Sequence, residues 1–116
     1  MLTEIQVVKD KVTLAMLKEL AGERFGDLVK AVVDIELGVM AIGGEMHSDE
    51  EEILLSAGSK QENLWGINLY PDKRGEDFIE FDSMINIRPR QGNRSRGVEN
   101  CAIQEKIKKI VSNLVD

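Results

Sequence analysis

The stretch LVKAVVDIELGVMAIGG, residues Leu28–Gly44, decides the fold of this chain. In its first half, apolar and polar residues alternate with the period of two that is typical of a strand with one buried face. Gly38 then turns the chain into a second apolar run, VMAI, which predicts a hairpin of two antiparallel strands. The expected buried face of the first strand consists of Val29, Ala31, Val33, Ile35 and Leu37.

Helices are expected on both sides of this hairpin in the sequence. A short strand in LTEIQVV, residues 2–8, is followed by leucines at spacings of three and four, which predict an amphipathic helix over residues 11–25. After the hairpin, Ser48 with Glu51 three residues later has the form of a capping box and predicts a short helix over residues 48–57. An apolar stripe from Glu99 onward predicts the last helix.

Two further runs, LWGINLY at residues 64–70 and FIEFDSMINIR at residues 78–88, predict a second pair of strands. The expected order is therefore (β)α-ββ-α-ββ-α, in a single domain over residues 1–116. Such an order predicts an α+β fold: a two-layer sandwich of a mainly antiparallel sheet with its helices mostly on one face.

Composition limits the expected partners. The formal net charge is −6, which disfavours nucleic acid and anionic membranes unless a local basic patch exists. We expect no signal peptide, because residues 1–6 already contain an acid among the apolar residues, and no apolar run approaches the ~20 residues that cross a bilayer. The single cysteine, Cys101, excludes an internal disulfide and fits a reducing cytoplasm, where we expect the protein.

Four of the six arginines lie within INIRPRQGNRSRG, and the segment 83–98 contains no Asp, Glu or Lys. A guanidinium is a planar fork suited to two-point contacts with carboxylates or phosphates. We therefore expect Arg88 and Arg94 to bind carboxylates or an external anion. The candidate anion-binding residues are Arg88, Arg90, Asn93, Arg94, Ser95 and Arg96.

Internal pairing is the alternative interpretation of this arginine stretch. The loop would then dock on the five acids of residues 45–52, either in the same subunit or in a dimer mate. Nucleic acid is not expected, because none of the five aromatic residues lies among the arginines.

The stretch GGEMHSDEE, residues 43–51, contains the only histidine of the chain. In an extended chain Glu45, His47 and Asp49 would share one face, and their side chains are of the types that bind divalent metals. The capping box is the rival account of the second half of this stretch. His47 is also the only side chain whose ordinary pKa lies near neutrality.

Polar side chains are expected on the non-core faces of three predicted strands. If these faces coincide, the open side of the sheet carries carboxylate, amide and guanidinium groups, a mixture that suits a small polar ligand or acid–base chemistry. A solvated face, or a dimer interface through the sheet, is the alternative. The candidates on this polar sheet face are Asp34, Asn68, Asp82 and Asn86, beside Lys30 and Arg88.

The stretches GGEMHSDEE, LWGINLYP and INIRPRQGNRSR together resemble an uncharacterised family of small prokaryotic proteins, a domain of unknown function. The resemblance covers roughly residues 28–96 and is looser in the flanking helices. It implies a prokaryotic cytoplasmic protein, and it implies no catalytic residues.

Three functions fit these observations. The leading hypothesis is a small cytoplasmic binding or interaction module, expected to be a homodimer, whose arginine-rich loop contacts a small anionic ligand or an acidic protein surface. The first alternative is a metal-assisted hydrolase of a phosphorylated substrate, which would use Glu45, His47 and Asp82 beside the arginines. The second alternative is a structural subunit of a protein complex. The sequence identifies no cofactor, and a divalent metal is less expected than none.

Overall fold

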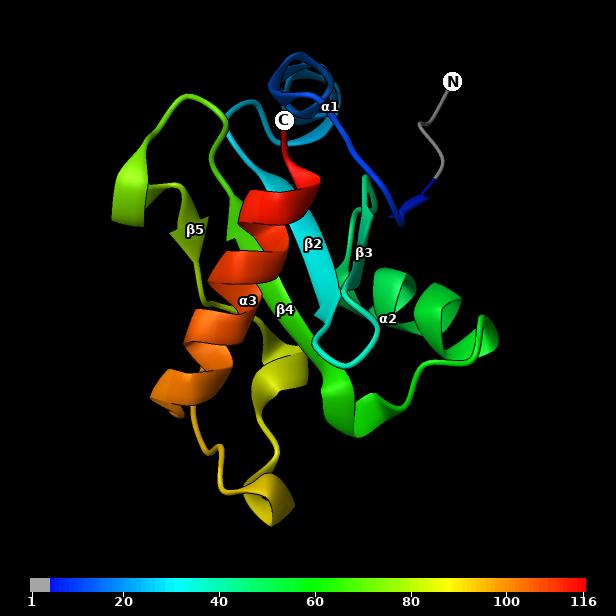
Figure 1. Cartoon of the computed structure of the whole chain (residues 1–116), viewed down its shortest axis with the longest axis vertical. Coiled ribbons are helices and arrows are strands. Elements are labelled where there is room, and N and C mark those ends of the chain that lie inside the picture. Colours follow the sequence, from blue (N-terminus) through cyan, green and yellow to red (C-terminus); the bar gives the residue numbers. More distant parts are fainter. Residues whose placement is uncertain (1–4) are drawn as a thin grey trace.

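The computed structural model describes residues 5–116 as a five-stranded antiparallel sheet with three α-helices (Figure 1). The strand order is β1-β3-β2-β4-β5. The α+β class and the antiparallel sheet expected from the sequence are thereby confirmed. The elements are β1 Gln6–Val8, α1 Leu14–Arg24, β2 Val29–Asp34, β3 Val39–Ile42, α2 His47–Ser56, β4 Leu64–Leu69, β5 Ile79–Glu80 and α3 Cys101–Leu114. The first residues of the LTEIQVV strand, 2–4, lie outside the described residues.

The predicted hairpin forms the centre of the sheet. β2 pairs with β3 on one side and along its whole length with β4 on the other. Asp34 ends β2, and its Oδ1 accepts hydrogen bonds from the backbone N–H groups of Glu36 and Leu37 at 2.8 and 2.9 Å. The strand is therefore shorter than expected, and Leu37 lies in the turn with 60% of its surface exposed instead of in the core.

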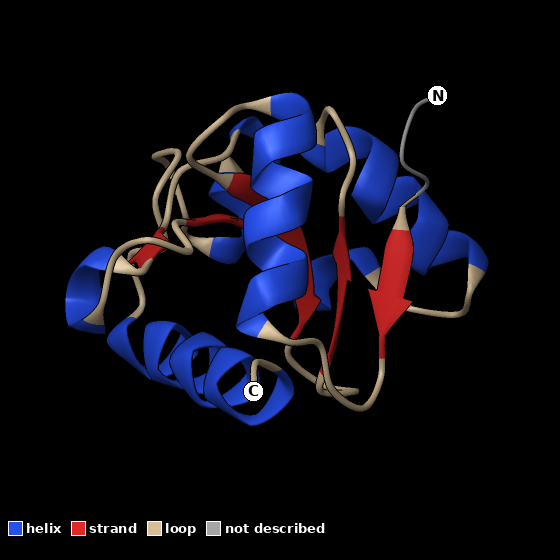
Figure 2. Cartoon of the chain, turned by 90° about the horizontal axis from the view of Figure 1, so that it is seen from above, coloured by secondary structure: helices blue, strands red, loops and turns tan. Residues whose placement is uncertain are grey.

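The two faces of the sheet are covered differently. The main core lies between the sheet and α1 and α3, and α2 packs on the opposite face, so helices lie on both sides of the strands (Figure 2). Two of the three helices share one face, as expected. The smaller cluster under α2 consists of Val32, Ala41, Leu54 and Leu64. The main cluster includes Leu17, Leu20, Ala31, Val33, Met40, Ile42, Trp65, Ile67, Ile107 and Val111.

The prediction of one long strand over residues 78–88 is wrong. β5 contains only two residues and pairs with only Asn68 and Leu69 of β4. The chain then forms short 3₁₀ turns at Met84–Asn86 and Pro89–Gln91. The remaining edge of β4 is bound by side chains, which take the place of a backbone ladder.

The start of α2 also differs from the prediction. The helix begins at His47, with Met46 as its N-cap residue, and no side chain caps it. The capping-box prediction is wrong because Ser48 lies inside the first turn. One consequence is that His47, Glu50 and Leu54 share the buried face of α2, toward the sheet.

Candidate functional site

A small cavity of about 180 Å³ lies on the sheet face that α2 covers. Its floor is formed where β2 and β4 run side by side, because Lys30 is the register partner of Asn68. The N-terminus of α2 and the segment 82–85 form its walls. The complete lining is Lys30, Met46, His47, Ser48, Asn68, Asp82, Ser83, Met84, Ile85 and Arg96.

Two cations face this cavity. Lys30 is half-buried, and its ammonium lies 4.9 Å from the centroid of the Phe25 ring. It makes no ion pair within residues 5–116. Arg96 donates from Nε to Asp82 Oδ1 at 2.6 Å. Its two terminal nitrogens donate to none of the described side chains or backbone groups, so one edge of the guanidinium remains available.

His47 is buried beside these cations. Its Nε2 lies 2.8 Å from the backbone oxygen of Ile67. Because a carbonyl oxygen only accepts, Nε2 carries the proton, and Nδ1 of the neutral ring is left as an acceptor. Burial lowers the pKa of His47, and the positive charge of Lys30 acts in the same direction, against the hydrogen bond to Ile67. The imidazole is therefore neutral at pH 7.

Asn68 supplies an unsatisfied acceptor. Its Nδ2 donates to Glu80 Oε1 at 2.9 Å and to the backbone oxygen of Asp82 at 3.4 Å. Its Oδ1 is buried and accepts no hydrogen bond from the described part of the chain. A buried acceptor without a donor costs about 1–3 kcal/mol, so a donor from a ligand or a water is expected there.

The polar sheet face predicted from the sequence is assembled in part. Asn68 and Asp82 meet in the cavity together with Lys30. Asn86 is fully buried and binds the backbone of β4 instead. Asp34 lies in the β2–β3 turn, where its Oδ2 accepts a hydrogen bond from Ser59 at 2.6 Å.

The arginine stretch does not act as one group. Arg88 lies with its guanidinium 4.3 Å from the centroid of the Trp65 ring and donates to the backbone oxygens of Gln61 and Leu64. The expected carboxylate partner of Arg88 is thus replaced by carbonyl oxygens and an aromatic face. Arg88 is bound to the β4 edge and does not face the cavity.

The tip of the same stretch is held by an asparagine and a glutamate. The Nδ2 of buried Asn93 donates to the backbone oxygens of Asn86 and Gly97 at 2.7 and 2.8 Å. The Glu99 carboxylate accepts from the backbone N–H groups of Arg94 and Ser95, both at 2.8 Å. Arg94 therefore contacts a carboxylate through its backbone, while the Arg94 and Arg90 side chains are exposed and make no hydrogen bond within residues 5–116. Of the four arginines, only Arg96 lines the cavity.

The predicted metal ligands are not brought together. The Glu45 carboxylate is bound by Arg24 at 2.9 Å, His47 is turned inward, and Asp49 is exposed. The expectation required an extended chain through Asp49, but the helix already begins at His47. Among residues 5–116, no three His, Cys, Asp or Glu side chains are arranged as ligands of one metal ion. The partner of Glu45 is thus Arg24, not the arginine stretch.

The family model described as "Protein of unknown function (DUF5674)" matches residues 6–114. The chain belongs to the DUF5674 family. This confirms the resemblance to an uncharacterised family of small domains. No curated protein and no solved structure matches the chain. Within the described part of this DUF5674 protein, no helix is long and apolar enough to cross a membrane.

Sequence reasoning missed one buried acid of this DUF5674 protein. Glu50 is fully buried, its Oε2 accepts a hydrogen bond from the Gly44 N–H at 2.9 Å, and its Oε1 has no partner within residues 5–116. Burial raises the pKa of Glu50 well above its usual range. Glu50 lies three residues after His47 on the same face of α2, and this spacing could have predicted its burial. The neighbouring acids in the sequence instead favoured an exposed position for Glu50.

Proposed function

We propose that this protein binds a small anionic group, such as a phosphate or a carboxylate of a ligand, in the cavity between α2 and β4. Lys30 carries this proposal, because it is half-buried, makes no ion pair within residues 5–116 and lines the same cavity as Arg96. A partly buried charge loses hydration, and a bound anion compensates for that loss. The cavity, about 180 Å³, suits a head group better than a whole ligand, since complete small-molecule sites occupy about 300–1,000 Å³.

The remaining lining suggests what surrounds the anionic group. Asn68 Oδ1 and His47 Nδ1 are acceptors, so the ligand is expected to present a hydroxyl or N–H near its charge. Met46 and Met84 line the cavity with 56% and 66% of their surfaces exposed, and they offer apolar contacts to the rest of the ligand. Asp82 binds Arg96 but repels negative charge, which favours an anion of low charge.

Titration calorimetry with inorganic phosphate tests this proposal. We expect saturable binding that Arg96→Gln and Lys30→Gln each weaken by about tenfold or more, because hydrogen bonds to charged groups are among the stronger ones. Arg94→Gln is the matched control, since it removes an arginine from the same stretch but outside the cavity. Equal losses in the Arg94→Gln and Arg96→Gln variants, or no saturable heat with the native protein, would reject the proposal.

The expected homodimer and prokaryotic cytoplasmic location belong to the same proposal. A second copy seated over Met46 and Met84 would bury both methionines and place the ligand near the interface. Sedimentation of the native protein and of a Met84→Glu variant tests the dimer. A dimer that the substitution dissociates supports it, and a native protein that stays monomeric at every concentration rejects it.

His47 favours hydrolysis of a phosphorylated substrate as a second candidate function. A neutral imidazole with its Nε2 proton held by the Ile67 carbonyl oxygen is suited to accept a proton at Nδ1 from an attacking water. Turnover of p-nitrophenyl phosphate, with and without added Mg²⁺, Mn²⁺ or Zn²⁺, tests this function. His47→Asn should abolish turnover while phosphate binding persists; absence of turnover under all these conditions would leave binding as the function.

A further inference from the structure

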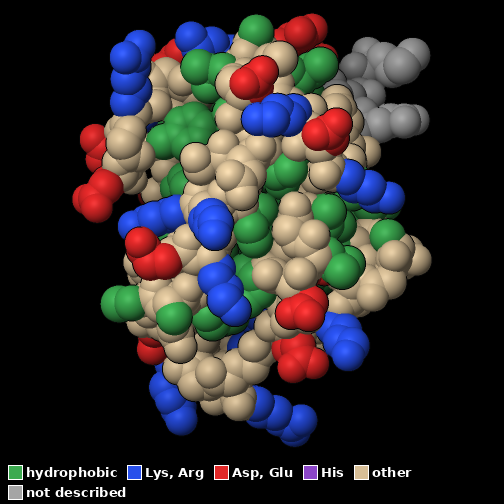
Figure 3. All heavy atoms as spheres, in the orientation of Figure 1, with side chains coloured by type: hydrophobic (Ala, Val, Ile, Leu, Met, Phe, Trp, Pro, Cys, Tyr) green, Lys and Arg blue, Asp and Glu red, His purple; other side chains and the backbone are tan. Residues whose placement is uncertain are grey.

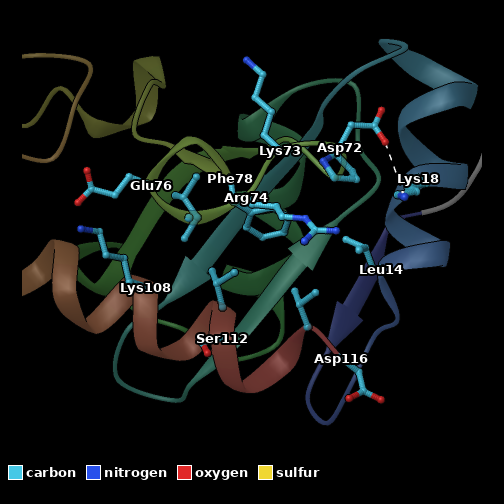
Figure 4. A pocket seen from close by; sticks show the side chains of 15 residues that line it. Leu14, Lys18, Asp72, Lys73, Arg74, Glu76, Phe78, Lys108, Ser112 and Asp116 are labelled. Atoms are coloured by element: carbon cyan, nitrogen blue, oxygen red, sulfur yellow. Dashed lines mark ion pairs between the residues drawn. The ribbon is translucent and has the colours of Figure 1, made fainter.

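A second, larger cavity of about 700 Å³ lies at the main-core side of the sheet. It opens between α1, α3 and the loop from Pro71 to Phe78 (Figure 4). Its deeper wall is apolar and continues the main core, because half-buried side chains pack there against the buried cluster. The apolar residues of this wall are Leu14, Phe78, Ile79, Val111 and Val115.

Most cations on the rim of this cavity already have partners. Lys18 lies 3.8 Å from Asp72, Lys108 pairs with an acid of its own helix at 3.2 Å, and Lys73 lies 4.6 Å from the centroid of the Tyr70 ring.

Arg74 differs from these lysines. Its side chain is exposed and makes no ion pair or hydrogen bond within residues 5–116. Figure 4 shows its guanidinium extending from the loop past the Phe78 ring toward Leu14 on α1. A free guanidinium therefore lies directly beside an apolar wall.

We propose that this cavity binds an organic carboxylate with an apolar body. The two carboxylate oxygens would accept a two-point contact from Arg74, and the apolar body would lie against Phe78, Ile79 and Val111. The volume falls within the range of about 300–1,000 Å³ that is usual for small-molecule sites. The acids on the rim, Asp72, Glu76 and Asp116, favour a ligand with a single negative charge over a phosphate monoester.

This site is independent of the small cavity under α2. The two cavities share no lining residue, and they are formed by different helices. The ligands that they favour also differ, since the small cavity has room for a head group only. Failure of one proposal therefore leaves the other unaffected.

Titration calorimetry of the full chain with octanoate tests the proposal, and 1-octanol, which has the same chain without the charge, is the ligand control. We expect Arg74→Gln to weaken octanoate binding by about tenfold or more. Arg90→Gln, which removes another exposed arginine outside the cavity, should leave binding unchanged. Ser112→Trp places a large side chain from α3 in the cavity and should abolish binding.

Three outcomes of the calorimetry would overturn this proposal. They are equal affinity for octanoate and 1-octanol, unchanged octanoate affinity in Arg74→Gln, and no saturable binding of octanoate to the native protein. Sedimentation tests whether a second copy of the chain, instead of a carboxylate, occupies the cavity. If the native protein is a dimer that Ser112→Trp dissociates, and the variant still binds octanoate with native affinity, the cavity is a subunit contact and the carboxylate site is likewise rejected.

Discussion

The side-chain amide of Asn86 forms a pair of hydrogen bonds with the backbone of Gly66. Its Oδ1 accepts from the Gly66 N–H at 2.8 Å, and its Nδ2 donates to the Gly66 oxygen at 2.9 Å. The same Nδ2 donates to the backbone oxygen of Arg96 at 2.9 Å. One asparagine thus completes the edge of β4 and fixes the backbone of the arginine that lines the small cavity.

Gly66 is required at this point by close packing. A Cβ atom at this position would lie 2.6 Å from both Cβ and Oγ of Ser83 and 3.2 Å from Cδ2 of His47. The absent side chain therefore allows Ser83 and His47 to approach β4, and this approach shapes the small cavity. His47 is not visible on the α3 side of the molecular surface (Figure 3).

The first prediction concerns Asn86. Asn86→Ala leaves the buried N–H and oxygen of Gly66 without partners, so we expect the free energy of unfolding to fall by roughly 3 kcal/mol. Asn86→Asp keeps an acceptor but loses both donated bonds, and it should also be destabilising. Urea unfolding measures both effects. Asn113→Ala, at an exposed position of α3, is the control and should change stability little; a similarly small effect of Asn86→Ala would contradict the proposed role of Asn86.

The second prediction concerns Arg88 and the single tryptophan. Arg88→Lys keeps the charge but loses the planar stack on Trp65 and the fork that reaches two backbone oxygens. We expect a loss of about 1–2 kcal/mol in stability and a changed fluorescence spectrum of Trp65. Arg90→Lys, at an exposed neighbouring position, should change neither quantity. An unaltered melting curve for Arg88→Lys would show that the stack contributes nothing.

The sequence predicted the central elements well because their periodicity reflects burial directly. Val29, Ala31 and Val33 lie in the main core as predicted, and Lys30 lies on the other face, which α2 covers and where Val32 is also buried. Over residues 78–88, the same alternation wrongly predicted one long strand. Asn86 and Arg88 repeat with the period of a strand, but they bind the β4 edge through their side chains, and a linear pattern does not distinguish that geometry from a backbone ladder.

The small cavity was predictable only in part, for a similar reason. The alternation of side chains along β2 and β4 predicts that their polar positions share one face of the sheet, and it correctly placed Asn68 there. The sequence does not distinguish Arg96 from the other three arginines of the stretch. Its place in the cavity depends on the path of the loop, which the side chains of Asn86 and Asn93 fix. The predicted metal ligands Glu45, His47 and Asp49 are not brought together because α2 begins at His47, which changes the directions of the side chains from that residue onward.

The third prediction concerns Glu50 and pH. Because burial raises its folded pKa above the ordinary value, the folded state holds a proton that the unfolded state loses above about pH 4.5. The stability associated with this group is complete below that pH and declines as the pH rises toward the folded pKa. Glu50→Gln removes the decline and should stabilise the protein by on the order of 1 kcal/mol at pH 7.

Urea unfolding of native and variant proteins between pH 4.5 and pH 7.5 measures the Glu50 effect. The stability difference should grow as the pH rises across this range. Glu52→Gln, which changes an exposed acid of the same helix, should show little pH-dependent gain. A constant difference between native protein and Glu50→Gln would mean that Glu50 is ionised in the folded state, contrary to its burial.

The last prediction concerns His47 and the charge of the small cavity. At pH 7 the neutral imidazole leaves Lys30 and Arg96 as the cavity cations, opposed by Asp82. Burial lowers the pKa of His47, so protonation in the free protein occurs below about pH 6.5 and adds a third positive charge. Sulfate, whose charge is constant in this range, should therefore bind more tightly as the pH falls from 7.5 to 5.5. Affinity should rise by up to about tenfold for each unit by which sulfate raises the imidazole pKa.

Calorimetry in buffers of different ionisation enthalpy measures both the affinity and the protons taken up with sulfate. His47→Asn should bind sulfate with a flat pH profile and without proton uptake, while circular dichroism confirms that the variant is folded. Asp82→Asn removes the opposing charge, so it should bind sulfate more tightly at every pH but keep the slope that His47 causes. If the slope persisted in His47→Asn, His47 would not be the group whose protonation strengthens sulfate binding.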